Sequence, residues 1–558
     1  MAYWNDFAPT GHYLSKPPGQ TMTLNASFHK ICVSLIAATL LAAGCQSVKQ
    51  RVADVRKSPQ EKFAARLSDA LNTKRGGAML AAQVIDLQTG EEWFSQNPDT
   101  PMIPASNGKL AISAAGLAMF GPAHTFKTYL VRDGDDLWII GTGDPGCGDP
   151  KIAEWRGETV TTMFDAWADA MKRRGLTKVK GNLIYWDGAF DRELTYTGWK
   201  PDFLVDWYGA PVSGLNFNDN CIDIKAFPGA DGQPARLEVV PANDLAVITN
   251  KTVTNGEGTP AIDRAASAPQ FTITGGVSKE TKLESKPVTD PGAFFADAFR
   301  VHMKSRGISI DGETRRAEAL PFSPAGPMFD RIIATHETSM SDVLKRINKN
   351  SQNMFAEAMS KALGREWMFR RGQSVPGSWK LGEAATKEFL WANRINAGSY
   401  VAADGSGLDR TNQVTARLIT DLLVTMHHRR DGKLWRESLA VAGVDGTIGK
   451  RMADMEGRVM AKTGYISGVR SLSGYVHTKN GKWLAFSFIY NEIDGSVKPY
   501  EVLQDNACRV MYHWPEKPIF PAAAPLPAAS QPAEPTTAPS GAEPASQPTP
   551  QPASMPAV

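Results

Sequence analysis

The 558-residue sequence contains only five cysteines, and two of them, Cys32 and Cys45, lie in an N-terminal segment with the layout of an export signal. The other three, Cys147, Cys221 and Cys508, are too few and too scattered for a disulfide framework or a zinc site. At most one disulfide can form, which leaves one thiol free. The nine histidines show no H-E-x-x-H or similar ligand spacing. The sequence therefore predicts no metal site and no cofactor.

Neither sign of charge dominates, because 61 lysines and arginines are balanced by 58 aspartates and glutamates, for a net charge of +3. No basic block occurs that could follow a phosphate backbone, which argues against nucleic acid as a partner. The 42% hydrophobic and 21% charged residues are typical of soluble globular proteins. At about 150 residues per domain, the length corresponds to about three or four domains.

The apolar run at residues 31–43 is too short for a permanent bilayer-spanning helix, which needs about 20 residues. It follows Met22, His29 and Lys30, and Gly44 and a cysteine come directly after it. A short cationic region, an apolar run and a small-residue cleavage site are the layout of a secretory signal peptide. Met22 is an alternative start of translation.

The segment Ala42-Ala43-Gly44-Cys45 resembles the bacterial lipobox, in which the cysteine becomes the lipidated first residue of the mature protein; Ala42 stands where leucine is usual. Each buried methylene of an acyl chain contributes about 0.8 kcal/mol, so several chains on Cys45 would anchor the protein stably. The resemblance, with Gln46 after the cysteine, implies a periplasmic lipoprotein on the outer membrane of a Gram-negative cell. An ordinary signal peptide is the alternative, and it too implies export.

No G-x-S-x-G motif occurs, so a nucleophile elbow of the α/β-hydrolase type is not supported. Three other motifs follow one another along the chain: Ser106-Asn107-Gly108-Lys109, Ser351-Gln352-Asn353 and Lys462-Thr463-Gly464. S-x-x-K or S-x-N arises by chance about once or twice in a chain of this length, and K-T-G is about tenfold rarer. Their occurrence together and in this order predicts a serine nucleophile that is served by two lysines.

Ser106 is the predicted nucleophile. It precedes the Ala-rich segment 110–120, a predicted buried helix, and Lys109 lies on the same helix face within reach of its hydroxyl. The helix N-terminus directs backbone N–H groups toward developing negative charge. Lys109 can be the base only if its pKa falls from about 10.4 to near 7. Burial and the charge of Lys462 are the expected causes.

The third motif is expected to contact substrate. It lies in a predicted strand, whose alternation places Lys462 and Gly464 on one face. Gly464 permits close approach of a substrate backbone, and the N–H of Tyr465 is the expected second oxyanion donor. Thr463 is expected to assist with a substrate carboxylate.

The second motif is expected on the opposite wall of the cleft. Ser351 could pass a proton between Lys109 and a leaving nitrogen, and Asn353 could bind a peptide carbonyl. The alternative is that Ser351 is only the N-cap of the apolar helix that follows it.

The three motifs resemble those of the penicilloyl serine transferases, and their surroundings are similar to the class C low-molecular-mass penicillin-binding proteins, the D-alanyl-D-alanine carboxypeptidase/endopeptidase family. The resemblance implies an α/β fold in which a penicillin-binding, β-lactamase-like transpeptidase domain packs helices on an antiparallel sheet and carries two mostly β domains between the first and second motifs. Further matches, spread over most of residues 60–510, are Gly143-Asp144-Pro145, Asn218-Asp219-Asn220, Ala403-Asp404-Gly405-Ser406-Gly407-Leu408 with Arg410 and Asn412, and Val441-Ala442-Gly443-Val444-Asp445-Gly446-Thr447.

The resemblance also implies a serine-type D-Ala-D-Ala carboxypeptidase and DD-endopeptidase that acts on peptidoglycan stem peptides through an acyl-enzyme on Ser106 and is inhibited by β-lactams. Arg410 and Asp202, or Asp206 nearby, correspond to family positions associated with the diaminopimelate end of the substrate. In one departure from the family pattern, Asp409 stands where serine is usual and could pair with Arg410.

The 241 residues between Lys109 and Ser351 exceed a typical whole domain. Strand-like runs at 136–140, 222–226, 246–253 and 271–273 support inserted β domains, and 291–306 is a predicted helix. After the third motif, strands are predicted at 458–465, 471–477 and 483–490, the last two joined at Asn480-Gly481. The predicted divisions are a leader (1–44), a linker (45–59), the catalytic domain (60–125 and 335–516), inserted domain II (126–210 and 305–334), inserted domain III (211–304) and a Pro/Ala-rich disordered tail (517–558).

Two other functions are compatible with the motifs. One is a β-lactamase or esterase on the same catalytic domain, which would need a base that activates water for deacylation. The other is a non-catalytic wall-binding lipoprotein with a decayed site.

Overall fold

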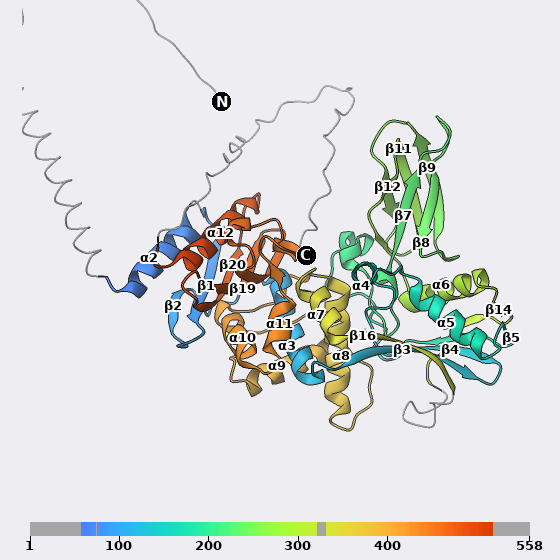
Figure 1. Cartoon of the computed structure of the whole chain (residues 1–558), viewed down its shortest axis with the longest axis horizontal. Helices are drawn as coiled ribbons and strands as arrows, with labels where there is room; N and C mark the ends of the chain where they lie inside the picture. Colours follow the sequence, from blue (N-terminus) through green and yellow to red (C-terminus); the bar gives the residue numbers. More distant parts are fainter. Residues whose placement is uncertain (1–56, 74, 321–330, 517–558) are drawn as a thin grey trace, which may run out of the picture. The chain divides into compact units, whose positions relative to one another are not determined.

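The structure is a computed structural model that describes residues 57–73, 75–320 and 331–516 (Figure 1). The predicted signal segment, Cys45 and the proline-rich tail lie outside these residues. The chain divides into two compact units, Met1–Lys62 and Phe63–Val558, and all three motifs belong to the second. Within the described ranges, none of the helices combines the length and the apolar character that crossing a bilayer requires.

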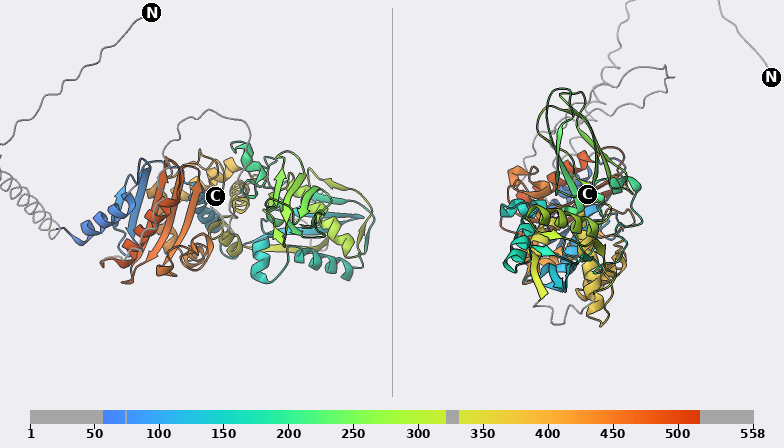
Figure 2. Two further views of the ribbon diagram at one scale, coloured as in Figure 1. Left: turned by 90° about the horizontal axis from the view of Figure 1, so that it is seen from above. Right: turned by 90° about the vertical axis from the view of Figure 1, so that its right-hand side faces the viewer.

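A six-stranded antiparallel sheet combines strands from both ends of the second unit, in the order β17-β18-β19-β20-β1-β2. β1 pairs with β20 along its whole length, from Met79 opposite Asn491 to Asp86 opposite Leu484. Figure 2 shows these strands, in blue and orange, side by side. The strands are β1 (Met79–Asp86), β2 (Glu92–Gln96), β17 (Ala440–Val441), β18 (Val459–Ile466), β19 (Val469–His477) and β20 (Trp483–Asn491).

Helices cover both faces of this sheet. Because successive strand residues point to opposite faces, each strand contributes side chains to both helical layers. Phe486 and Phe488 of β20 pack with α2 and α12, whereas Ala485 and Ile489 pack with α3, α8 and α10. Gly116 lets α3 approach α8, since a Cβ there would overlap the Met359 side chain. The helices are α2 (Pro59–Asn72), α3 (Lys109–Phe120), α7 (Met340–Asn348), α8 (Asn353–Phe369), α9 (Trp379–Ala392), α10 (Ala416–His428), α11 (Gly432–Glu437) and α12 (Lys498–His513).

The residues between the first and second motifs build the remaining sheets. A five-stranded sheet has the order β15-β6-β4-β3-β16, and α5 and α6 pack their aromatic residues on it. The two-stranded β14-β5 sheet is separate from it. The elements are β3 (Thr125–Asp133), β4 (Asp136–Gly141), α4 (Pro150–Arg156), α5 (Thr162–Arg173), β5 (Lys178–Val179), β6 (Leu183–Trp186), α6 (Pro291–Ser305), β14 (Ser309–Ile310), β15 (Thr314–Arg316) and β16 (Ile332–Ser339).

Two further sheets lie in the green segment of Figure 1. One has the order β12-β7-β13 with β8 also paired to β7, and the other has the order β10-β11-β9. Their strands are β7 (Cys221–Phe227), β8 (Arg236–Val240), β9 (Val247–Thr254), β10 (Ala261–Arg264), β11 (Gln270–Val277), β12 (Thr281–Lys282) and β13 (Lys286–Pro287). Short 3-10 helices connect the elements: η1 (Ala105–Gly108), η2 (Pro201–Val205), η3 (Trp207–Gly209), η4 (Asn218–Asn220), η6 (Gly446–Ile448) and η7 (Ala453–Met455).

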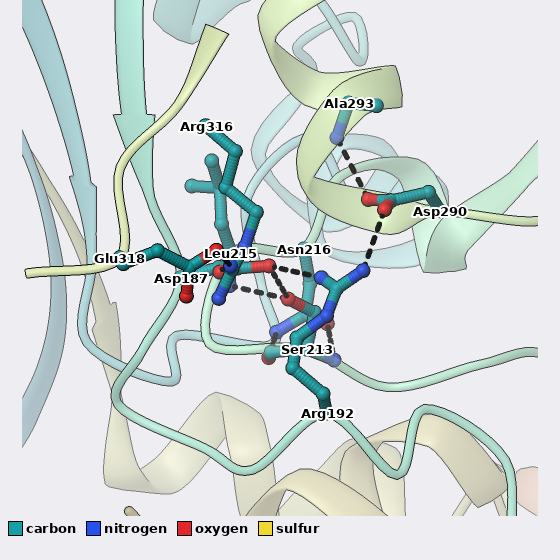
Figure 3. Close-up of polar contacts among 9 residues, drawn as sticks. All are labelled: Asp187, Arg192, Ser213, Leu215, Asn216, Asp290, Ala293, Arg316 and Glu318. Atoms are coloured by element: carbon teal, nitrogen blue, oxygen red, sulfur yellow. Dashed lines mark hydrogen bonds and ion pairs between the residues drawn. The ribbon is translucent and has the colours of Figure 1, made fainter.

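A buried ion cluster joins the end of β6 to α6 and β15 (Figure 3). The Asp187 carboxylate accepts hydrogen bonds from Arg192 Nη1 at 2.9 Å and Arg316 Nε at 2.7 Å. Arg192 also donates to Asp290, whose other oxygen caps the first turn of α6 at Ala293. The side chain of Asp187 is only 1% exposed, so the two guanidinium groups compensate a charge that water does not reach.

The fold class agrees with the prediction: helices pack on an antiparallel sheet, and β-rich segments stand between the first and second motifs. The predicted helix at 110–120 is α3, and the predicted strands around the third motif are β18, β19 and β20. The helix predicted at 291–306 is α6, and it packs with α5 against the five-stranded sheet. The three cysteines within the described residues, Cys147, Cys221 and Cys508, are buried and free, so no disulfide joins them.

Candidate active site

Ser106 lies in η1, on the tight turn that leads into α3. The preceding residue, Ala105, has a φ of 48°, a left-handed conformation that is rare outside glycine. Gly407 packs against the Ala105 carbonyl. A Cβ on residue 407 would overlap the carbonyl oxygen of Ala105. Ser106 is 0% exposed, so its hydroxyl is held in a fixed and dry position. Backbone strain of this kind gathers at functional sites.

Lys109 is the first residue of α3, and its amine lies among three oxygens. Nζ is 2.8 Å from Ser106 Oγ, 2.7 Å from Asn353 Oδ1 and 2.8 Å from the Ser406 carbonyl. A neutral amine has two N–H donors and one lone pair. In the neutral form the amide and peptide oxygens, which only accept, can take the two N–H groups, and the lone pair can then face the Ser106 hydroxyl. The predicted contact between serine and base is present.

Burial lowers the pKa of Lys109 to about 7, while the negative charges of Glu357 and Asp404 oppose this shift. Lys462, which the sequence suggested as a second cause beside burial, has its own pKa lowered well below the usual value by burial and then by the charge of Lys109. Burial, the first predicted cause, therefore agrees with this shift, whereas the charge of Lys462 is not among its causes.

Ser351 faces the second lysine across the site. Lys462 Nζ lies 2.7 Å from Ser351 Oγ and 2.8 Å from the Thr463 carbonyl. α8 begins at Asn353 with Gln352 as its N-cap residue, and Ser351 has a left-handed φ of 61° before it. Ser351 is therefore not the helix cap, and its hydroxyl is directed at the lysine instead.

Asn353 connects the base to the segment that contains η3. Its Oδ1 accepts from Lys109, and its Nδ2 donates to the Tyr208 carbonyl at 2.8 Å. Gln352, between the two motif residues, donates to Asp219 at 2.8 Å, away from the amines. The middle residue of the second motif thus points away from the two lysines.

Gly464 brings β18 against the turn that holds Ser106. A Cβ at this position would lie 2.7 Å from the Pro104 carbonyl oxygen and 3.1 Å from the Ser106 nitrogen. No side chain larger than hydrogen fits there without moving the backbone around the serine. Lys462 and Gly464 share this face of the strand, as their spacing predicted.

The outer edge of β18 is open beside the site. Among the described residues, β17 pairs only with Met460 and Ala461, so no strand covers the edge beyond them. Val459 uses this edge to accept a hydrogen bond from Ala442. Because backbone groups alternate along an antiparallel strand, the N–H of Tyr465, six residues further on, points to the same edge. An extended peptide could add to β18 here.

A basic cavity of about 1210 Å³ adjoins this open edge at Thr463 and Tyr465. Thr463 donates to Thr447 Oγ1 at 2.9 Å on its wall. Eight cationic side chains and three carboxylates line the cavity, namely Lys151, Arg156, Lys345, Lys349, Lys450, Arg451, Arg470 and Lys498 with Asp342, Asp445 and Glu501. The excess of positive charge favours an anionic ligand.

The structure does not bring Arg410 and Asp202 into contact with the two lysines. Arg410 is exposed and donates to the Ser467 carbonyl at the β18–β19 turn, 2.6 Å away. Asp409 bonds to Thr411 instead, so the expected pairing with Arg410 is wrong. Asp202 is exposed in η2, and within the described ranges it makes no polar contact with a motif residue.

Sequence reasoning missed two buried carboxylates behind Lys109. Glu357 accepts from the backbone N–H of Gly405 at 2.6 Å and of Ser406 at 2.9 Å, which orients the Ser406 carbonyl toward Lys109. Asp404 accepts from Gly407 N–H at 2.7 Å. Burial and the charge of Asp404 raise the pKa of Glu357 to about 7. The available signal was Glu357 itself, the only polar residue in the stretch 354–359, because it lies four residues after Asn353 and therefore on the same helix face.

The comparisons with known proteins agree with this geometry. The D-Ala-D-Ala carboxypeptidase 3 (S13) family matches residues 63–504. A D-alanyl-D-alanine carboxypeptidase from Actinomadura sp. (strain R39) is 31% identical over 446 residues, which are 75% of this chain and 79% of that protein.

Two solved structures of penicillin binding protein 4 (dacB) from Haemophilus influenzae have the same fold. The first has a TM-score of 0.65 and 21% identity over 79% of this chain and 97% of the other. The second, complexed with a β-lactam, has a TM-score of 0.60 and 22% identity over the same shares of both chains. The extent of the family match and the identity to the Actinomadura enzyme show that this chain belongs to the D-Ala-D-Ala carboxypeptidase 3 (S13) family of serine-type carboxypeptidases.

Proposed function

We propose that this protein removes the terminal D-alanine of peptidoglycan stem peptides, and cleaves D-amino-acid cross-links, through an acyl-enzyme on Ser106. The observation that carries the proposal is the position of Lys109 Nζ, 2.8 Å from Ser106 Oγ and otherwise surrounded by hydrogen-bond acceptors. A buried amine with a pKa near 7 can take the serine proton at physiological pH.

Acylation starts when Lys109 accepts the Ser106 proton and Oγ attacks the carbonyl carbon of the penultimate D-alanine. The backbone N–H groups of Ser106 and Tyr465 then stabilise the oxyanion. Support comes from the packing of Gly464 against the Ser106 nitrogen and from the outward direction of the Tyr465 N–H. Removing a single donor of this kind costs about 10²–10³ in rate.

The leaving amine receives its proton through Ser351. Ser351 Oγ lies 2.7 Å from Lys462 Nζ, so a proton given to the amine is replaced from the lysine pair. Peptide binding also requires Asn353 to exchange its bond to the Tyr208 carbonyl for one to a substrate carbonyl. The Tyr208 carbonyl thus occupies the position that we expect for a carbonyl of the substrate backbone. Water then hydrolyses the ester, and Lys109 again acts as the base.

The basic cavity supports endopeptidase as well as carboxypeptidase activity. Its volume of about 1210 Å³ exceeds that of most small-molecule pockets, whereas a departing D-alanine needs far less space. A cross-linked substrate leaves with a whole neighbouring stem, which carries several carboxylates. The cavity begins at Thr463 and Tyr465, where a leaving group would emerge from the open strand edge.

Purified muropeptides test the proposal directly. We expect release of D-alanine from monomeric pentapeptides and conversion of cross-linked dimers to monomers. Ser106→Ala should lower both rates at least about a thousandfold. Ser113→Ala is the matched control, because Ser113 is a buried serine of α3, the helix that follows Ser106, and bonds to Asn348 rather than to a lysine. Wild-type rates in the Ser106 variant would refute the acyl-enzyme.

Reaction with β-lactams separates the alternatives. We expect a fluorescent penicillin to label the wild type and not the Ser106→Ala variant, because the β-lactam carbonyl would take the place of the peptide carbonyl. A long-lived adduct supports the peptidase, whereas rapid turnover would support a β-lactamase or esterase. Failure of both labelling and muropeptide cleavage would support a wall-binding lipoprotein.

We further propose that the protein is exported and anchored through Cys45, and that Arg410 and Asp202 recognise the diaminopimelate end of the stem. Palmitate labelling of cells that produce the wild type or Cys45→Ser tests the anchor. Substrates with and without the diaminopimelate carboxylate test Arg410→Ala, which should lose the preference for the charged form.

A further inference from the structure

Three potential metal ligands meet away from the proposed catalytic residues. Asp144 and Cys147 lie in the loop between β4 and α4, and His336 lies on β16. His336 Nδ1 is 3.0 Å from Asp144 Oδ2, Cys147 Sγ is 3.4 Å from His336 Nδ1, and Cys147 Sγ is 3.5 Å from Asp144 Oδ2. These three atoms therefore lie at the corners of a triangle whose sides are 3.0, 3.4 and 3.5 Å long.

Hydrogen bonds can form along at most two sides of this triangle. The thiol carries one hydrogen, Nδ1 carries at most one, and a carboxylate carries none, so at most two sides can be bonded. A cation at the centre satisfies all three atoms together. With Zn–S of about 2.3 Å and Zn–N and Zn–O of about 2.0–2.2 Å, tetrahedral geometry separates the ligand atoms by about 3.3–3.6 Å. The observed separations of 3.0, 3.4 and 3.5 Å are close to these values.

A cysteine protease triad does not explain the cluster. In such a triad the acid and the thiol bond to different nitrogens of the imidazole, so that a proton can pass across the ring. Here Asp144 and Cys147 both meet Nδ1.

The surrounding groups orient the three ligands. Asp144 Oδ1 accepts from the Gly146 N–H at 2.9 Å, which leaves Oδ2 directed at the triangle. Thr128 Oγ1 lies 3.3 Å from Cys147 Sγ, where its hydroxyl can donate to a thiolate. Thr128 stands opposite His336 in the β3–β16 pairing, so the sheet fixes both. Partners of this kind hold metal ligands in place.

A tetrahedral site with three protein ligands keeps one position for a water molecule. A cavity of about 20 Å³ is lined by His336 and Gly146, although not by Asp144 or Cys147, and about 10–15 Å³ is enough for one water. The Thr338 hydroxyl, two residues beyond His336 on the same strand face, sits against Gly146. It is 1% exposed and has no hydrogen-bond partner among the described residues, so a metal-bound water could supply one.

We propose that Asp144, Cys147 and His336 bind one divalent cation of the zinc type, with water as the fourth ligand. Thiolate and imidazole ligands favour zinc over magnesium or calcium. Binding releases the Cys147 proton to solvent, and the metal replaces it as the sulfur's partner. The third ligand is far from the other two in sequence, which is why the spacing of cysteines and histidines predicted no site.

The site would act on structure rather than on the reaction. The loop that carries Asp144 continues to Asp149, which bonds to Arg346 at 2.8 Å. Arg346 also bonds to Asp219, the partner of Gln352 in the second motif. The cation thus fixes the loop at one end of a chain of contacts that reaches the neighbour of Ser351.

Cobalt binding followed by absorption spectroscopy tests the site on the purified, reduced full chain. We expect one equivalent of Co²⁺ to give tetrahedral d–d bands and a thiolate charge-transfer band, and Zn²⁺ to displace it. Cys147→Ser should lose the charge-transfer band, and His336→Gln should weaken binding at least about tenfold. Cys508→Ser is the matched control, because Cys508 is also buried and free but has no such ligand cluster within the described ranges.

Thermal unfolding with and without Zn²⁺ gives a second measurement. We expect Zn²⁺ to raise the unfolding temperature of the wild type and of Cys508→Ser, because a ligand that binds the folded state stabilises it. The rise should be absent in His336→Gln. This variant provides the test if Cys147→Ser does not fold. No stoichiometric binding by the wild type, or equal binding by His336→Gln, would overturn the proposal.

Discussion

Gly464 illustrates how a single missing side chain positions the proposed nucleophile. We predict that Gly464→Ala lowers kcat/KM for D-alanine release by about 10²–10³, because the new Cβ would push on the Pro104 carbonyl and the Ser106 nitrogen. Release of D-alanine from a synthetic pentapeptide measures the effect. Gly108→Ala is the control, since its Cβ would meet only ordinary contacts at 3.5 Å and beyond. Equal activity of both variants would contradict the prediction.

Glu357 raises the pKa of Lys109, the proposed base, against the larger effect of burial. We predict that kcat/KM of the wild type rises with pH through about 7, because only the neutral amine accepts the serine proton. A carboxylate raises the pKa of a nearby lysine, so Glu357→Gln should move the rising limb to lower pH. The pH profile of kcat/KM measures the shift.

The control for this experiment is Glu388→Gln, whose carboxylate is exposed and bonds to Arg371 far along the chain from the motifs. We expect its profile to match the wild type. If Glu357→Gln lowers kcat/KM at every pH but leaves the rising limb at the same pH, the carboxylate only supports the 404–407 loop.

The five proposed catalytic residues could be named from the sequence because each belongs to a short motif with a local geometric reason. Ser106 and Lys109 are one helical turn apart, and alternation along β18 places Lys462 beside Gly464. Glu357, Asp404 and Tyr208 could not be assigned in this way. Their roles depend on how separate segments pack around one buried amine, and no local spacing encodes that packing.

At the scale of elements, the sequence predicted those with strong local patterns, such as α3, α6 and the β19–β20 hairpin. It did not predict sheet order, because β16 pairs with β3 and β15 with β6 across long stretches of chain. The domain boundaries stay our proposal. The packing of α6 on the five-stranded sheet favours ending inserted domain III before Pro291 rather than at residue 304.

The Asp187 cluster ties α6 to this sheet, so removing its charge should loosen the whole arrangement. We predict that Asp187→Asn lowers the free energy of unfolding by about 3–5 kcal/mol, because two guanidinium groups lose a buried partner. Urea unfolding followed by tryptophan fluorescence measures the loss. Glu318→Gln is the control: its side chain is 87% exposed, and it should cost less than about 1 kcal/mol. Similar losses in both variants would refute a buried charge network.

At the scale of the whole molecule, we predict that the basic cavity beside the open edge of β18 favours acidic substrates. Most of its cations are paired with carboxylates, for example Arg470 with Glu501 and Lys349 with Asp445. Lys345 and Lys450 have no carboxylate partner among the described residues, and both line the cavity. An acidic leaving stem would meet these two charges first.

We therefore predict that Lys345→Ala and Lys450→Ala each raise KM for cross-linked, carboxylate-rich muropeptides about two- to fivefold, which corresponds to about 0.4–1 kcal/mol per exposed ion pair. Because neither lysine contacts the reacting groups, kcat should not change, and KM for a short monomeric pentapeptide should stay the same. Added salt should weaken binding of the cross-linked substrate by the wild type more than by the double variant. Lys479→Ala, an exposed lysine outside the cavity, is the control. An equal rise in KM for the short peptide would show that the lysines support the site generally rather than hold the leaving stem.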